Sequence, residues 1–210
     1  MISRLLVLAI LIFSMSAPAL AHPHAWIDLR SKVLLDEAGR MHALQLDWIF
    51  DDYYTVAIAD EVDLSEQIPD DVWDSIAERN LNNLIDYDYF TVVKADGVAV
   101  EFGEVSRYSG GLRDGRMWMQ FEVPLIEPID PRSQAVSFSI YDPTYYIEMI
   151  HLKGDVITFD GEGSDRCRGN IRQPNPTFEQ VSLAAALDQN ESGGDGLGEL
   201  FAETVILHCS

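Results

Sequence analysis

Apolar and polar residues alternate along residues 25–35 and again along residues 44–50 of this 210-residue chain. A short turn sequence, Asp-Glu-Ala-Gly at residues 36–39, separates the two runs. Alternation with a period of two is typical of a strand that buries one face, and a short polar turn between two such strands makes a hairpin. The chain therefore has to build a sheet from antiparallel neighbours.

The turn also predicts the register of this hairpin. If Leu35 pairs with Arg40, the apolar residues of both strands lie on one face of the sheet, whereas a shift by one residue would oppose apolar to polar side chains. This register predicts three pairs: His24 opposite Asp51, Asp28 opposite Asp47, and His22 opposite Tyr53.

The rest of the chain mixes short strands with helices. Strand signals occur at residues 90–94, 98–102, 117–123, 135–141 and 156–159, with Asp-Gly turns at 96–97 and 114–115. Helical spacing of apolar residues predicts a helix over 71–85, which begins with acidic side chains, and a shorter one over 178–187. We expect an α+β fold: one antiparallel, β-rich, sandwich-like domain with two or three helices.

Residues 1–21 have the pattern of a secretory signal peptide. Arg4 is followed by an apolar run over residues 5–13 and by Ala-Leu-Ala at 19–21, a small-x-small cleavage pattern. The apolar run is too short to span a bilayer. We therefore expect a single periplasmic domain over residues 22–210 that begins with His22. The alternative is an uncleaved amino-terminal anchor, which would leave no free amine at His22.

Charge restricts the class of partner. Residues 22–210 carry 13 basic and 35 acidic side chains, a formal charge of −22 with histidine neutral. Nucleic acid is not an expected partner, because its phosphates would be repelled. A negative field of this size raises the local concentration of cations, although most acidic side chains on such a surface are simply solvated.

The chain contains two cysteines, Cys167 and Cys209. An even number of cysteines in an exported chain favours a disulfide, because thiols are oxidised in that compartment. We predict a Cys167–Cys209 bridge that ties the carboxyl terminus to the body. A metal site using His208 and Cys209 is the alternative, but neighbours in a strand point to opposite faces.

Two histidines at the expected new amino terminus are the strongest candidates for metal ligands. His22 and His24 project to the same side of an extended segment, and Pro23 favours that extension. Imidazole binds zinc, copper and nickel. Pro23 has no amide proton, which excludes the square-planar amino-terminal chelate. Two geometries stay open: a brace of amine and imidazole, or imidazoles with a carboxylate. The candidate metal ligands are His22, His24, Asp51, Asp142 and His151.

Two further segments have competing interpretations. Asp142 precedes a proline within the Tyr-Asp-Pro-Thr-Tyr-Tyr run at 141–146, which is typical of an ordinary turn. Residues 188–199 match part of a calcium-binding loop, but Asp195 stands where that loop has an apolar residue. Acidic glycine-rich loops produce such matches by coincidence. We find no nucleophile elbow, phosphate-binding loop or zinc-protease motif, and we do not expect an enzyme.

Four stretches of the chain resemble the DUF1007 family of exported bacterial proteins. They are His-Pro-His-Ala-Trp-Ile-Asp at 22–28, Trp-Ile-Phe-Asp at 48–51, residues 141–146, and Leu-Gly-Glu-Leu-Phe-Ala at 197–202, which leads to Cys209. The resemblance implies a periplasmic component of an uncharacterised ABC-type transport system. It also implies an association with nickel/cobalt (NicO) permeases and with zinc uptake.

Together these features predict a periplasmic metal-binding accessory protein. It would capture a divalent metal, zinc first, with copper or nickel as alternatives, through His22, His24 and Asp51. It would then present the ion to an inner-membrane permease of NicO or ABC type. One alternative is a structural or docking subunit of that transporter with no metal of its own. Another is a copper protein with an amino-terminal histidine brace that also uses His151.

Overall fold

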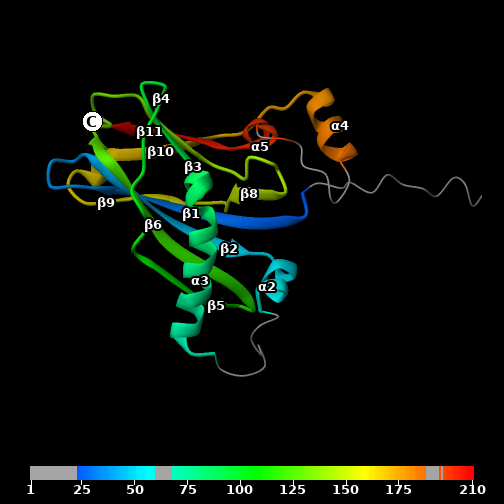
Figure 1. The fold of residues 1–210 in the computed structure, drawn as a ribbon. Helices are drawn as coiled ribbons and strands as arrows, with labels where there is room; N and C mark the ends of the chain where they lie inside the picture. Colours follow the sequence, from blue (N-terminus) through cyan, green and yellow to red (C-terminus); the bar gives the residue numbers. More distant parts are fainter. Residues whose placement is uncertain (1–22, 60–67, 188–193, 195) are drawn as a thin grey trace, which may run out of the picture.

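Two β-sheets form the body of the protein in the computed structural model, which describes residues 23–59, 68–187, 194 and 196–210 (Figure 1). The first sheet has the strand order β5 (Tyr108–Arg113), β6 (Arg116–Ile129), β2 (Met41–Phe50), β1 (Ala25–Leu35) and β8 (Ile147–His151), and β9 (Ile157–Asp160) also pairs with β1. The second has the order β10 (Cys167–Arg172), β11 (Thr204–Cys209), β7 (Val136–Ile140), β3 (Thr91–Ala95) and β4 (Val98–Ala99).

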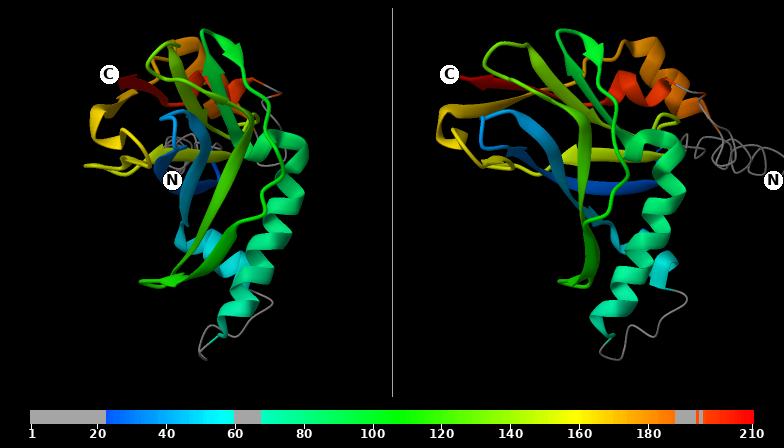
Figure 2. Two further views of the ribbon diagram at one scale, coloured as in Figure 1. Left: turned by 90° about the vertical axis from the view of Figure 1, so that its left-hand side faces the viewer. Right: turned by 60° about the vertical axis from the view of Figure 1, so that its left-hand side comes forward.

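Helices cover parts of this body. They are α2 (Asp52–Ala59), α3 (Asp70–Leu84), α4 (Phe178–Ala186) and α5 (Leu197–Phe201), with short 3₁₀ segments at Ile85–Phe90 and Ser164–Arg166. Figure 2 shows α3 running along one side of the strands, where it packs on β5. Gly110 of β5 makes this contact possible, because a Cβ there would meet the backbone of Trp73 in α3. In the described part of the chain, no helix is long and apolar enough to cross a membrane.

Both sheets contribute to one hydrophobic core. Leu29, Trp48 and Phe121 come from the first sheet, and Val93 and Phe138 from the second, and all five are almost completely buried. The predicted α+β, antiparallel-rich fold is confirmed. The described residues hold four α-helices instead of two or three. The additional two, α2 and α5, have eight and five residues, which is too short for a clear helical period in the sequence.

The predicted hairpin forms, but its predicted register is wrong by two residues. Ile27 pairs with Phe50, where Trp48 was expected. One residue of the shift comes from a three-residue turn that ends at Gly39, whose φ of 74° is left-handed. The other comes from a bulge opposite Leu34 and Leu35. A register shift of two residues leaves the apolar side chains of both strands on the same face of the sheet. The predicted alternation of buried and exposed residues is therefore correct, although each predicted cross-strand pair is wrong.

β1 also pairs with two parallel strands, β8 and β9. The sequence did not predict this parallel pairing. β8 lies beside the first half of β1 and β9 beside its second half, both parallel to it. Between them the chain leaves the sheet, and Ser31 lies at this break, where its backbone N–H donates to the Val156 carbonyl at 2.9 Å.

The Cys167–Cys209 disulfide is present, as predicted. The two cysteines are directly opposite each other in the antiparallel pair of β10 and β11, with Cα atoms 4.2 Å apart. The bridge therefore joins the last strand of the chain to its neighbour. The helices predicted over 71–85 and 178–187 correspond to α3 and α4.

Candidate functional site

His24 lies immediately before β1. Its backbone N–H donates to the Tyr146 carbonyl at 2.9 Å, and its ring centroid lies 4.9 Å from the ring of Tyr146. The residue is thus held on the body of the protein by the turn that precedes β8. Among the described histidines, His24 is the nearest in sequence to the expected mature amino terminus.

Tyr54 of α2 is close to the same place. Its ring stacks on Phe50 with centroids 5.0 Å apart. Burial raises the pKa of the Tyr54 hydroxyl, and the neighbouring Tyr146 and Asp51 raise it further. The phenol is therefore a neutral hydrogen-bond donor at ordinary pH. We call His24, Asp51, Tyr54 and Tyr146 the β1-start cluster.

Asp51 has a structural task that the predicted register did not include. The pairing places it opposite Trp26 rather than His24: Asp51 N–H donates to the Trp26 carbonyl at 3.0 Å, and Trp26 N–H donates to Asp51 Oδ2 at 2.6 Å. Its other oxygen, Oδ1, accepts from the Tyr54 N–H at 2.8 Å, which is the geometry of a helix cap. The predicted pairing of Asp51 with His24 is wrong, because the strand has shifted and α2 begins here.

Asp142 is a buried turn residue. Its Oδ1 accepts from both the backbone N–H and the hydroxyl of Thr144 at 2.9 Å, and its Oδ2 accepts from the Ile147 N–H at 3.0 Å. These bonds fix the turn that follows β7 and leads into β8. The ordinary-turn interpretation of the Asp-Pro pair accounts for all three contacts.

His151 belongs to a buried polar network. Its Nδ1 lies 2.8 Å from Glu203 Oε2, its Nε2 lies 2.9 Å from Ser31 Oγ, and its backbone N–H donates to Glu203 Oε2 at 2.8 Å. Gln173 donates to the other oxygen of Glu203 at 2.7 Å. Because an ionised carboxylate can only accept, Nδ1 donates to Glu203, and Nε2 shares a hydrogen bond with the Ser31 hydroxyl. Both ring nitrogens of His151 are therefore used within the protein.

The hydrogen bonds from His151 and Gln173 stabilise the charged form of Glu203. Burial raises the pKa of Glu203, but the hydrogen bonds from the His151 ring, the His151 backbone and Gln173 outweigh that effect and leave the pKa below its ordinary value. The carboxylate thus stays ionised at neutral pH in a place where an unpaired charge would be costly. We call Ser31, His151, Gln173 and Glu203 the β1–β8 network.

The order Ser–His–Glu resembles the relay of some hydrolases. A nucleophile in such an enzyme has to be reached by the substrate. Ser31, His151 and Glu203 are only 2%, 6% and 5% exposed. In this structure the network supports the fold and is closed to an incoming carbonyl group.

Four of the five candidate metal ligands lie in the described part of the chain, and the structure does not bring any three of these four together: His24, Asp51, Asp142 and His151. His22 and most of the 188–199 calcium-loop match lie outside the described residues. Among the residues that are described, no three His, Cys, Asp or Glu side chains are grouped so that they could hold a metal ion. Asp51, Asp142 and His151 are occupied in three different hydrogen-bond systems, and only Asp51 shares the β1-start cluster with His24.

Comparison with known proteins places the chain in a family. A family model described as "Protein of unknown function (DUF1007)" matches residues 7–209. The chain belongs to the DUF1007 family. This DUF1007 protein is also similar to an uncharacterized protein of Haemophilus influenzae (strain ATCC 51907 / DSM 11121 / KW20 / Rd). The two are 25% identical over 193 residues, which cover 90% of this chain and 92% of the relative.

The partners of the buried His151 in this DUF1007 protein are not evident from its sequence. One signal was present: Ser31 occupies an inward position of β1 between Leu29 and Val33, and a buried hydroxyl requires a partner. Glu203 gave no signal, because it lies in a loop before the last strand. Tyr54 gave no signal, because α2 has only eight residues and shows no clear helical period in the sequence.

Proposed function

We propose that this DUF1007 protein is a periplasmic accessory protein that captures a divalent metal ion, zinc first, at its amino-terminal histidines. It presents the ion to an inner-membrane permease of NicO or ABC type. The observation that supports this proposal is the attachment of His24 to the body through Tyr146, which fixes one imidazole at the start of β1. His22 lies two residues earlier in the sequence.

The ligand set of the proposal is smaller than the sequence suggested. His22 and His24 remain as the first two ligands, and Asp51 is the candidate carboxylate. Each oxygen of Asp51 accepts one backbone hydrogen bond, which uses one of its two lone pairs. Asp142 and His151 are dropped, because their oxygens and nitrogens already hold the β7–β8 turn and the β1–β8 network.

Two general properties favour this setting. The formal charge of −22 for residues 22–210 attracts cations toward the surface. The Cys167–Cys209 disulfide suits an oxidising compartment such as the periplasm. Both properties agree with export and with a cationic ligand, and neither depends on the geometry of the β1-start cluster.

A docking subunit without a metal is the second candidate. The outward side of the first sheet exposes Trp26 of β1 and Ile150 of β8, which lie on neighbouring strands. Exposed large apolar residues close together are typical of contact surfaces. The copper-brace alternative loses support, because His151, its proposed extra ligand, is buried and uses both ring nitrogens.

Titration calorimetry with zinc tests the metal proposal on protein that has been exported and begins at His22. We expect one saturable site that weakens at least about tenfold, or about 1.4 kcal/mol, in His24→Ala. His208→Ala is the matched control, because His208 is exposed on β11 and should leave the affinity unchanged. Equal isotherms for the parent and His24→Ala would refute the metal assignment and favour the docking subunit.

A further inference from the structure

The outward face of the second sheet is hollowed at its centre. Its middle strand, β7, alternates buried apolar residues with Ser137 and Ser139, which point away from the core. Longer side chains stand on either side: Lys94 on the adjacent strand β3, opposite Ser137, and Arg172 on β10, which lies beyond β11, opposite Thr204. Small residues in the centre and long ones around them leave a pocket of about 220 Å³.

Hydrogen-bond donors converge on this pocket. Ser139 Oγ lies 3.4 Å from Thr204 Oγ1, and Arg172 Nη2 lies 3.4 Å from the same oxygen. Tyr141 also lines the pocket. Burial raises the pKa of Tyr141, and the nearby Glu199 carboxylate raises it further, so the phenol keeps its proton. Four hydroxyls and one guanidinium therefore line one small space.

The charge of this pocket is unusual for the chain. Acidic residues outnumber basic ones 35 to 14 in the sequence, yet Lys94 and Arg172 both border the pocket with one acidic residue, Glu199. Lys94 Nζ is 3.7 Å from Glu199 Oε1, and the two side chains are 43% and 60% exposed. Such an exposed, long ion pair contributes little to stability. Another anion can therefore replace the Glu199 carboxylate beside Lys94.

We propose that this pocket binds a small anion that carries carboxylate or phosphate oxygens. The forked guanidinium of Arg172 matches either group, and Lys94 supplies a second positive charge. The hydroxyls of Ser137, Ser139, Thr204 and Tyr141 donate to the remaining oxygens. The volume is below the roughly 300–1,000 Å³ of sites for drug-sized molecules, so the ligand has to be small.

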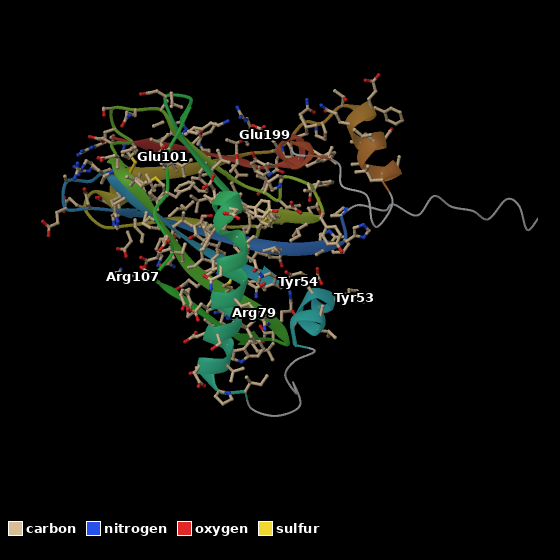
Figure 3. All side chains as sticks on the ribbon, viewed as in Figure 1. Tyr53, Tyr54, Arg79, Glu101, Arg107 and Glu199 are labelled. Atoms are coloured by element: carbon tan, nitrogen blue, oxygen red, sulfur yellow. A yellow bond between two sulfur atoms is a disulfide. The ribbon has the colours of Figure 1, made fainter. Side chains whose placement is uncertain are left out.

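This site is separate from the proposed metal site. Figure 3 labels Glu199 on α5 and Tyr54 on α2, and the two lie well apart in that view. The inference does not rest on the proposed function, and a failure of either leaves the other unaffected. Anion binding should persist in His24→Ala, and zinc binding should persist in variants of the pocket.

Titration of the metal-free protein with succinate and with inorganic phosphate tests the proposal. At least one probe should bind saturably, with a dissociation constant below about 10 mM, and binding should weaken about tenfold or more in R172Q. Arg168→Gln is the matched control: Arg168 is also an exposed arginine of β10 and does not line the pocket. It should change the affinity less than about threefold.

A second variant fills the pocket without a change of charge. Ser139→Val suits an outward strand position and should abolish binding of the probe, with the unfolding temperature checked separately. Binding of phosphate alone or of succinate alone identifies the preferred group, and either supports the site. The inference is overturned if neither probe binds below about 10 mM, or if R168Q and R172Q weaken binding equally.

Discussion

Glu203→Ala should destabilise the protein more than any change of a surface glutamate. The substitution removes the acceptor of the His151 backbone N–H and of His151 Nδ1, both at 2.8 Å. Each buried donor left without a partner costs about 1–3 kcal/mol, so the expected loss is about 2–6 kcal/mol. The total free energy of unfolding of a protein is typically about 5–15 kcal/mol, so the expected loss is a large fraction of the total.

Urea unfolding with the disulfide intact measures this loss. The fluorescence of Trp48 can report it, because that ring is buried against Phe121 with centroids 5.0 Å apart. Glu203→Gln keeps an acceptor oxygen for His151 and should cost about 1 kcal/mol, the difference between a charged and a neutral hydrogen bond. Glu162→Ala, at an exposed position, should stay within about 0.5 kcal/mol of the parent.

The pH dependence gives an independent check of the same network. The pKa of Glu203 is lowered in the folded state from its ordinary value of 4.5. A lowered pKa contributes stability above the unfolded value that is lost as the pH falls through the folded value. The stability difference between the parent and Glu203→Gln should therefore shrink below about pH 4.5.

The unfolding experiment also has a refuting outcome. If Glu203→Ala costs less than about 0.5 kcal/mol, the account of the β1–β8 network is refuted.

Three further substitutions test separate parts of the fold by the same unfolding assay. Asp51→Ala removes the cap of α2 and should cost about 1 kcal/mol; no loss would contradict the capping role. Replacing Cys167 and Cys209 by serine opens a loop of 42 residues and should cost up to about 4 kcal/mol, while an unchanged midpoint would exclude a stabilising bridge. Gly198→Ala drives a Cβ against the Asp142 carbonyl oxygen and should cost more than about 1 kcal/mol, as overpacking does; a neutral result would place α5 elsewhere.

Local pattern was enough to predict the longest helix and most of the longer strands, but not the short α2 and α5, not the strand β8, and not the partners of the strands. The alternation in β1 and β2 reflects which face of each strand is buried, and that face is the same in the predicted and observed registers. The register itself depends on the left-handed Gly39 and on a bulge. A bulge changes the partners of a strand without disturbing its own alternation, so the sequence pattern could not reveal it.

The candidate site was harder to predict than the fold for a related reason. Asp51 and His151 have the chemistry of metal ligands, but their partners in the structure are backbone N–H groups and the side chains of Ser31 and Glu203. Polar side chains with long-range structural partners look the same in a sequence as ligands. The Cys167–Cys209 pair was easier to predict, because two cysteines allow a single disulfide pairing and the alternative metal site with His208 needed two neighbours in a strand to share one face.

The end-to-end placement of β8 and β9 along β1 has a consequence for biogenesis. β1 is made early, but its contact with His151 spans a separation of 120 residues. Until that distant part of the chain arrives, one edge of an apolar strand stays open, and open edges invite pairing with other chains. Such late closure slows folding. A chain that ends before residue 147 should therefore aggregate, and a newly made chain would gain from a holding chaperone at this edge.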